Sequence, residues 1–262
     1  MIKHSFIFLD RIGQRFERRL WEEGVLTWDQ FCDAERIKGI SGMKKMFLDR
    51  KLAAARTAIE EEDASFFADQ FPFQESWRLY DEFKDDAVFL DIETADYYGS
   101  ITVIGLYDGQ ETKMMIRGFN LNKDILEQEL KKYKLIITFN GASFDLPIIR
   151  RYFGNIIPKI PHIDLRGVCS RIGLVGGLKR IEQEIGIKRP DDLLHVYGDD
   201  AVWLWHKFKE TQDMKYLDTL IRYNEEDIIN LKPLAEFAIP RLWKKTFLMR
   251  DTSLTGITQL RA

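Results

Sequence analysis

The spacing of the hydrophobic residues changes near residue 87 and separates two kinds of segment. Before this point apolar residues recur every three or four positions, as Phe16 and Leu20 do, which is typical of amphipathic helices. After it, the run AVFLDIET (87–94) and the alternating runs ITVIGLYD (101–108) and TKMMIRGF (112–119) are rich in residues that favour strands. A helical N-terminal part is therefore expected to precede a sheet.

Helix ends in the N-terminal part are marked by capping residues and by glycine. The run RFERRLWEE is followed by Gly24, where a helix C-terminus is expected. Thr27 stands in N-cap position before WDQF, with Gln30 three residues further on, which is the pattern of a capping box. A longer helix is expected from about Met43 to Glu62. These signals predict successive helices joined by short turns.

Strands and helices alternate in the middle of the chain. A helical run over residues 122–133 separates the third strand from a fourth apolar strand, LIITFN (135–140), and GASFDLPIIRRYF (141–153) opens another helix. Three sequential strands followed by this alternation predict a mixed α/β sheet. The remainder has apolar residues three and four apart and is expected to be mostly helical.

The length of 262 residues is enough for a medium domain and a small one. We expect a helical N-terminal region over residues 1–80, an α/β domain over residues 81–245 and a C-terminal tail over residues 246–262. The two cysteines, Cys32 and Cys169, predict neither a disulfide framework nor a zinc ribbon. The chain is therefore expected to be cytoplasmic, and since no apolar run approaches the roughly 18 residues of a membrane span, no membrane partner is expected.

The formal net charge of −3 bears on the kind of partner. Phosphate-binding surfaces are usually basic, so a mildly acidic chain argues at first against nucleic acid. Carboxylates that hold metal ions, however, add negative charge that a count without the ions does not offset. The net charge therefore leaves a nucleic-acid partner open.

Asp91 and Glu93 have the spacing of a metal-binding pair. They lie at i and i+2 in FLDIET, so on a strand both carboxylates project from one face while Ile92 points to the opposite core. Such a pair offers two ligands to a metal ion. Taken alone, it is more often a solvent-facing strand end.

Three further residues extend this pair. Asp145 follows the fourth strand, one turn into a helix, where it either faces the strand pair or only interacts with the helix dipole. Tyr223 and Asp227 lie four apart on an expected helix and so project from one face. Asp227 borders an apolar stripe, and a buried carboxylate needs a partner such as a metal. The alternative is a half-buried aromatic beside a surface charge.

In chain order the motifs read DxE on a strand, then NxxxFD, then YxxxD on a late helix. The set resembles the DEDDy group of DnaQ-like 3′→5′ exonucleases in the ribonuclease H-like superfamily. More narrowly, residues 85–240 resemble uncharacterised ribonuclease H-like proteins related to the exonuclease domain of family B DNA polymerases, with PHIDLRGV and GLKRIEQEIGIKRPD matching their intermediate segment. The resemblance implies a ribonuclease H-like mixed sheet flanked by helices and preceded by a small all-helical N-terminal region.

The resemblance also implies phosphodiester hydrolysis with two metal ions. Two hard divalent cations about 4 Å apart activate a water and stabilise the pentavalent phosphorus. Asp91 would bridge both ions, Glu93 and Asp227 would complete the site of the attacking water, Asp145 would support the second ion, and Tyr223 would orient the water. Oxygen ligands favour Mg²⁺ or Mn²⁺. The expected substrate is the 3′ end of single-stranded DNA or RNA, with DNA favoured.

Three residues beside the motifs are candidates for substrate contact. Thr94 lies just past the strand pair, where it would meet the terminal nucleotide. Asn140 is expected either to contact the substrate or only to cap its turn. Phe144 is expected either to stack on a base or to pack in the core, and the core is the preferred interpretation.

The segment FLDRIGQRFERRLWEEGV (8–25) resembles a helix-hairpin-helix element, with Gly13 at the hairpin and Arg11 in place of the usual first glycine. In such an element backbone N–H groups contact a phosphate without reading sequence. A second candidate is IKGISGMKKM (37–46). Both segments are equally compatible with ordinary corners of a small helical packing domain.

Two other functions compete with the exonuclease. A catalytically inactive nucleic-acid-binding module with the same fold would usually lack at least one of the site residues, and all of them are present. An α/β protein that binds a sugar phosphate or a nucleotide would need a glycine-rich loop after a strand, and neither GxGxxG nor the P-loop pattern occurs. The exonuclease is therefore the preferred hypothesis.

Overall fold

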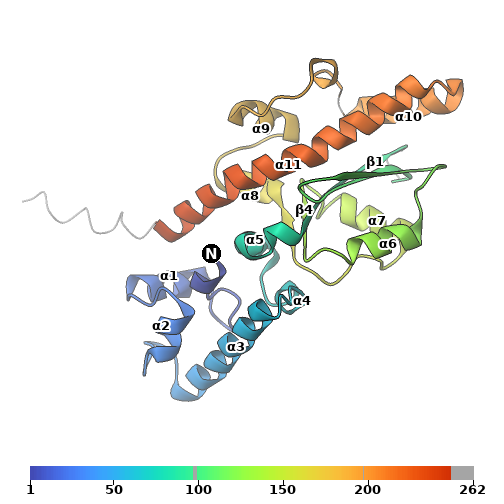
Figure 1. Ribbon diagram of the computed structural model, residues 1–262. Helices are drawn as coiled ribbons and strands as arrows, with labels where there is room; N and C mark the ends of the chain where they lie inside the picture. Colours follow the sequence, from blue (N-terminus) through green and yellow to red (C-terminus); the bar gives the residue numbers. More distant parts are fainter. Residues whose placement is uncertain (97–98, 197, 249–262) are drawn as a thin grey trace, which may run out of the picture.

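The computed structural model describes residues 1–96, 99–196 and 198–248. Figure 1 shows one long diagonal helix, α11, with the sheet along one half of it and the N-terminal region near its end. The N-terminal region contains these α-helices and short 3-10 helices (η): η1 Ile2–His4, α1 Gln14–Glu22, α2 Trp28–Asp33, α3 Gly42–Glu60, α4 Ser65–Ala68, η2 Phe73–Leu79, α5 Tyr80–Phe83 and η3 Lys84–Asp86. The remainder contains β1 Ala87–Thr94, β2 Ile101–Tyr107, β3 Thr112–Ile116, α6 Lys123–Leu130, β4 Leu135–Thr138, α7 Asp145–Phe153, β5 His162–Asp164, α8 Leu165–Arg171, α9 Leu178–Ile185, η4 Asp191–Leu193, α10 Gly198–Thr211 and α11 Met214–Leu248.

The five strands form one mixed sheet in the order β3-β2-β1-β4-β5. β1 and β2 are antiparallel, as are β2 and β3, whereas β4 runs parallel to both β1 and β5. The mixed α/β sheet expected from the sequence is thereby confirmed, with its four long strands at the expected positions. β5 was not expected, because three residues are too few to show an alternating pattern.

The two faces of β1 are covered by different helices. Val88 and Leu90 pack in one core with side chains of α6 and α7, and the neighbouring Phe89 packs in another with side chains of α11. Because successive side chains of a strand point to opposite faces, Asp91 and Glu93 belong to the face that α11 covers. The alternation along β1 therefore decides where the acidic pair points.

α11 is the longest element, and it connects the two parts of the molecule. Its 35 residues span about 50 Å at the rise of an α-helix. One half packs on the sheet, and the other half reaches the N-terminal region (Figure 1). Neither α11 nor any other helix of the described residues is long and apolar enough to cross a membrane.

The capping signals in the N-terminal region are confirmed. The Thr27 side chain accepts a hydrogen bond from the Gln30 backbone, and the Gln30 side chain accepts one from the Thr27 backbone, which completes the capping box of α2. α1 ends just before Gly24, and α3 begins one residue before Met43.

The segment before α1 differs from a full helix-hairpin-helix element. Only the short η1 precedes the bend, and residues 5–13 form turns rather than a helix. The bend itself is tight, since Arg11 adopts a φ of 60°, the left-handed conformation that glycine takes most easily. Gly13 is the N-cap of α1. The segment therefore lacks the first helix of a full helix-hairpin-helix element, although the tight turn forms despite Arg11.

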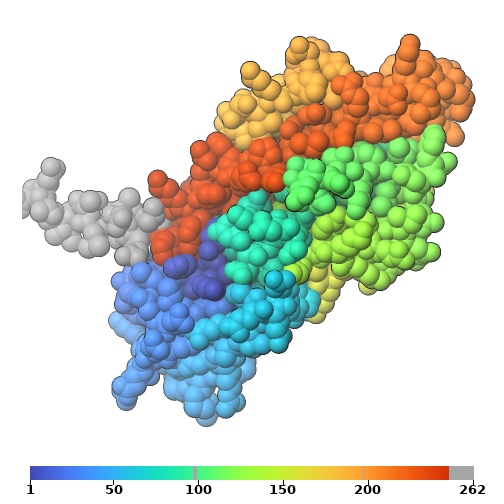
Figure 2. Space-filling view, viewed as in Figure 1, coloured from blue at the N-terminus to red at the C-terminus, as the bar shows by residue number. Residues whose placement is uncertain are grey.

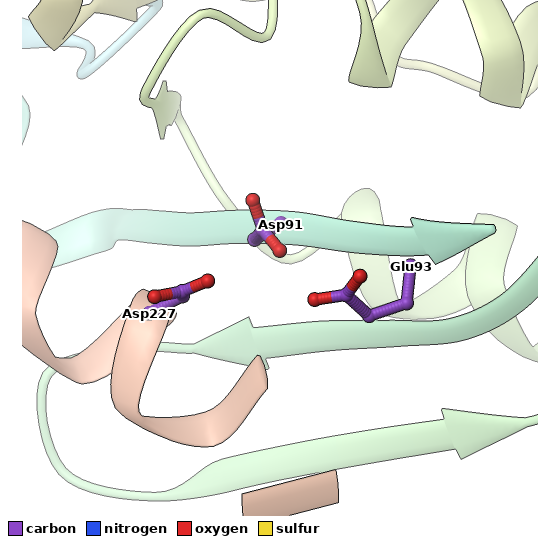
Figure 3. Close-up of side chains that lie close together, drawn as sticks. All are labelled: Asp91, Glu93 and Asp227. Atoms are coloured by element: carbon purple, nitrogen blue, oxygen red, sulfur yellow. The ribbon is translucent and has the colours of Figure 1, made fainter. Parts of the chain in front are cut away.

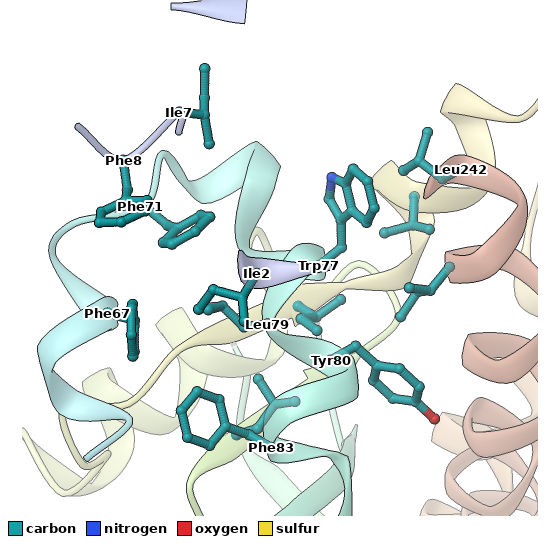
Figure 4. Close-up of a cluster of buried hydrophobic side chains, with 14 of the residues drawn as sticks. Ile2, Ile7, Phe8, Phe67, Phe71, Trp77, Leu79, Tyr80, Phe83 and Leu242 are labelled. Atoms are coloured by element: carbon teal, nitrogen blue, oxygen red, sulfur yellow. The ribbon is translucent and has the colours of Figure 1, made fainter. Parts of the chain in front are cut away.

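One hydrophobic core contains residues of both the N-terminal region and the sheet region. It includes Phe8 and Phe67 together with Ile163 of β5 and Leu242 of α11. Figure 4 shows Trp77, Leu79 and other side chains of the N-terminal region gathered beside α11, which carries Leu242, and Figure 2 shows the two parts in close contact. The N-terminal region is thus packed onto the sheet region along α11. α11 also continues through the first residues of the expected tail, whereas residues 249–262 lie outside the described residues.

A buried ion-pair network ties α1 to η2. The Arg78 guanidinium donates to both oxygens of Glu17, at 2.8 and 2.9 Å, and to Glu75 at 2.8 Å. Glu17 also accepts hydrogen bonds from the backbone N–H groups of Phe6 and Ile7, in the turns before α1. All three charged side chains are buried, so the cation is what makes burial of the two carboxylates possible.

Arg78→Met should destabilise the protein by about 3–5 kcal/mol, because Glu17 and Glu75 would remain buried without a cation. The free energy of unfolding from urea denaturation measures this loss. The double variant Glu17→Gln/Arg78→Met should lose less than Arg78→Met alone, because it removes one of the uncompensated charges. A loss no larger than that of the exposed substitution Lys123→Ala would contradict the role given to Arg78.

Candidate active site

The acidic pair of β1 meets the side chain of Asp227 on α11. Ligand oxygens of Asp91, Glu93 and Asp227 all lie within 4.8 Å of one another. Figure 3 shows the two β1 carboxylates and the carboxylate of Asp227 pointing into the same space. Glu93 and Asp227 are buried and Asp91 is partly buried, so the structure brings together three of the four carboxylates expected at the site.

The fourth carboxylate, Asp145, approaches β1 from α7. α7 begins at Asp145 itself, so the side chain lies at the first helical residue and not one turn into the helix. It is buried and accepts a hydrogen bond of 3.0 Å from the backbone N–H of Ile92, between the two acidic residues of β1. Asp145 therefore lies beside the three-carboxylate cluster, held by its hydrogen bond to β1.

Burial and mutual repulsion act on the protonation of this cluster. Burial, then the charge of Asp145, raises the pKa of Asp91 well above its usual range, and burial together with Asp227 does the same for the pKa of Glu93. Burial also raises the pKa of Asp145 to about 7 and that of Asp227 to about 6. When buried carboxylates repel one another, either protonation or a nearby cation stabilises them.

Arg189 supplies one such cation to Asp227. Its guanidinium donates a short hydrogen bond to Asp227 and two more to Glu182, at 2.6 and 2.7 Å. All three side chains are buried. Arg189 was not predicted from the sequence, because nothing in the local pattern of RPDD distinguishes it from a surface arginine.

Tyr223 lies one turn before Asp227 and is hydrogen-bonded to it. The ring is buried, with the Lys179 ammonium 5.2 Å and the Arg189 guanidinium 5.8 Å from its centroid. Burial, reinforced by the charge of Asp227, raises the pKa of the Tyr223 hydroxyl. The hydroxyl therefore keeps its proton at neutral pH.

Asn224 is a further site residue that the sequence analysis missed. Its amide donates to Asp91 at 2.7 Å and also hydrogen-bonds Glu93, so it links the two carboxylates of β1 to α11. It fits because β2 carries Gly105 directly opposite Asp91. A Cβ on Gly105 would lie 2.1 Å from Asn224 Oδ1 and 3.1 Å from Ile228 Cδ1. A glycine in the middle of a strand is the sequence signal for such a close approach.

The three candidate substrate residues have different surroundings. Thr94 is buried at the end of β1, next to an irregularity in the pairing with β2. Asn140 has a φ of 69°, and its side chain accepts hydrogen bonds from Ser143 and Arg166, so it does stabilise its turn. Phe144 is 41% exposed, so the preferred expectation of a core position is wrong. It lies where α7 begins, beside Asp145.

The donor set of the cluster fits a hard divalent cation. All ligand atoms are carboxylate oxygens, which Mg²⁺ and Mn²⁺ prefer. Among the described residues, Arg189 is the one cation found in an ion pair with the three-carboxylate cluster. One guanidinium shared with Glu182 leaves most of the negative charge uncompensated, and a bound cation would remove that imbalance.

The family model of the RNase H superfamily matches residues 88–239 of the chain. The chain belongs to the RNase H superfamily. The match covers all five strands and the carboxylates of β1, α7 and α11, so the ribonuclease H-like sheet expected from the sequence is confirmed. Membership of this superfamily supports a nuclease function.

Among solved structures, the chain is similar to RNase D of Escherichia coli, described as an exoribonuclease involved in structured RNA processing, with 16% identity and a TM-score of 0.44. The similarity covers 68% of this chain and 48% of the RNase D chain, so the chain spans about half the length of that protein. No curated protein matches the chain.

Gly105→Ala should destabilise the protein by about 1–3 kcal/mol, because the new methyl group overpacks the contact between β2 and α11. Urea denaturation measures the loss. The matched control is Gly167→Ala on α8, where a Cβ meets nothing within 4 Å and which should stabilise by up to about 1 kcal/mol. Equal effects of the two substitutions would show that α11 does not approach β2 this closely.

Without metal, the melting temperature should rise as the pH falls from 8 to 5. The folded-state pKa values of Asp145 and Asp227, about 7 and about 6, exceed their unfolded value. A raised pKa contributes stability that is present at low pH and lost as the pH rises through the folded value. Mg²⁺ should reverse this trend, because it should stabilise the protein more at pH 8 than at pH 5. At a Mg²⁺ concentration of a hundred times the dissociation constant, the free energy of unfolding should increase by about 2.7 kcal/mol.

Differential scanning fluorimetry in EDTA and in Mg²⁺ measures both effects. The variant Asp91→Asn/Asp227→Asn is the control, since it removes two of the repelling charges and should flatten both the pH dependence and the metal response. If Mg²⁺ changes the melting temperature of the wild-type protein no more than that of this variant, the cluster is not a cation site.

Proposed function

We propose that the protein is a 3′→5′ exonuclease of the DEDDy type, which hydrolyses phosphodiester bonds of single-stranded nucleic acid with two divalent metal ions. The observation that carries this proposal is the cluster of Asp91, Glu93 and Asp227, with Tyr223 hydrogen-bonded to Asp227. DNA is favoured over RNA because the motifs resemble polymerase proofreading domains. The 3′→5′ direction rests on the same resemblance.

The carboxylates are the residues that would hold the metal ions. Asp91, Glu93 and Asp227 would be ligands, and Asp145 would support the second ion from its place beside β1. Bound Mg²⁺ or Mn²⁺ would supply an activated water and positive charge near the phosphate. Asn224 would keep the two β1 carboxylates in place through its hydrogen bonds.

Tyr223 would orient the attacking water and would not act as a base. Its hydroxyl keeps its proton, because burial and neighbouring negative charge raise its pKa. A protonated hydroxyl next to Asp227 donates one hydrogen bond and accepts another, so it fixes the position of a water molecule. Lys179 and Arg189 near the ring hold Tyr223 in this place.

The second candidate is a nucleic-acid-binding module without catalysis. It is favoured by one observation, the ion pair between Arg189 and Asp227, which engages a carboxylate that the metal would need. For catalysis, Asp227 must bind the ion with its other oxygen, or Arg189 must keep only Glu182. An activity assay separates the two candidates.

The wild-type protein should shorten 5′-labelled single-stranded DNA from its 3′ end in Mg²⁺ or Mn²⁺, and EDTA should abolish the reaction. The variant Asp91→Ala/Glu93→Ala should be inactive, because it removes two metal ligands. Tyr223→Phe should lower the cleavage rate roughly 10- to 100-fold, since it removes the hydroxyl that orients the attacking water but keeps all metal ligands in place. Gel electrophoresis of the products, with an RNA of the same sequence in parallel, measures direction and sugar preference.

Tyr216→Phe is the matched control, since Tyr216 lies on the same helix and packs against Trp203. It should retain the wild-type rate. Intact oligonucleotides in every metal, from a protein that still binds them, would favour the inactive module. Cleavage that is unchanged in the double alanine variant would refute the site.

A further inference from the structure

Two neighbouring cavities lie where β5 and α8 meet the N-terminal region and α11. The larger has a volume of about 460 Å³ and is lined by Phe73, Trp77, Asp164 and Arg166, among others. The second, of about 190 Å³, is lined by residues of α1, η2 and α11. Arg171 lines both cavities. We call the two cavities together the β5 groove.

The β5 groove is connected to the loop that leads to the carboxylates. Asp164, in its wall, accepts hydrogen bonds from the backbone N–H groups of Asn140 and Ala142, at 2.8 and 3.1 Å. Arg166, also in its wall, donates to the Asn140 side chain at 2.7 Å. β5, in the wall of the groove, lies two strands from β1, so the two strands are roughly 10 Å apart at the usual spacing of neighbouring strands. An extended strand bound at the carboxylates needs only a few nucleotides to reach the groove.

The lining of the larger cavity includes an aromatic ring on which an unpaired base could stack. Phe73 leaves 46% of its surface exposed there, and the ring lies 5.5 Å from the ring of His162. The Arg171 guanidinium lies 5.5 Å from the ring of Trp77, which is itself buried, so the lining presents the exposed ring of Phe73 together with the cations Arg166 and Arg171. Exposed aromatics interleaved with basic groups are typical of surfaces that bind single strands by stacking.

The charge of the groove is opposite to that of the whole chain. Its basic residues that reach solvent are Arg18, Arg166, Arg171 and Lys245, of which Arg171 also pairs with Glu75 at 3.2 Å, whereas Arg78 is buried between Glu17 and Glu75. The carboxylates in its lining are engaged, because Glu17 pairs with Arg78 and Asp164 accepts backbone hydrogen bonds. In a chain of net charge −3, this gathering of cations complements a phosphate backbone.

We propose that the β5 groove binds the single strand upstream of its 3′ end, with one base in the larger cavity against Phe73 and phosphates beside Arg166 and Arg171. The proposal rests on the proposed nuclease function and assigns to the N-terminal region a direct part in substrate binding through Phe73. A strand held at both the carboxylates and the groove would be drawn along one path. Double-stranded ends would have to open before entering it, because a paired base cannot stack on Phe73.

The test uses the full chain in EDTA, with a single-stranded oligodeoxythymidine of ten nucleotides. A series of these strands carries 2-aminopurine at one position each, from the second to the sixth nucleotide before the 3′ end. Fluorescence anisotropy of a 5′-labelled strand gives the dissociation constant. Phe73→Ala should raise it roughly ten-fold, through the loss of one stacked base. It should also remove the quenching of 2-aminopurine at one position of the series. Arg166→Ala should lower the slope of log affinity against log salt by about 0.7.

Phe119→Ala is the matched control, since Phe119 is exposed but follows β3 at the opposite edge of the sheet. It should leave binding and quenching unchanged. If Phe73→Ala binds like the wild type and no 2-aminopurine position responds, the groove proposal is overturned, and the nuclease function still stands when the wild-type protein degrades the strand. If the wild-type protein neither binds nor degrades single strands, both proposals fail.

Discussion

The repulsion among four carboxylates that lie buried or half-buried around one strand is the constraint on which the rest of this structure depends. Each of them would remain in water if the fold did not hold it, since burial without a partner costs several kcal/mol. Hydrogen bonds offset part of this cost: the Ile92 N–H donates to Asp145, the Asn224 amide donates to Asp91, and the Arg189 guanidinium donates to Asp227. The negative charge that remains uncompensated is the reason why we propose that this cluster binds metal ions.

This arrangement requires α11 to pass unusually close to the sheet. The contact is possible because β2 has no side chain at Gly105, so the Asn224 side chain fits against the strand backbone. Tyr223 and Asp227 then come to the carboxylates of β1 from the same helix face. The same helix continues to Leu242, in the core of the N-terminal region. One rigid element thus positions the acidic site and the groove beside it.

The sequence could predict the parts of the site that depend on short-range periodicity. Asp91 and Glu93 share a face because a strand alternates, and Tyr223 and Asp227 share one because a helix turns every 3.6 residues. The mixed sheet followed from the same periodicities. The sequence could not reveal Arg189 or Asn224, because each acquires its role from a partner 38 or 133 residues away. Phe144 was misjudged for a related reason: its apolar character suggests a core, but the loop before α7 leaves it exposed.

The way the N-terminal region covers the sheet has a consequence for how this protein could have evolved. β5 has only three residues and stands at an edge of the sheet, where unpaired strands tend to recruit other chains. η2 packs against it, and the apolar residues of both parts form one core. The two parts are therefore poor candidates for exchange as separate modules. A descendant that lost the helical region would expose the apolar side chains of this shared core, so selection for solubility alone would keep the two parts together.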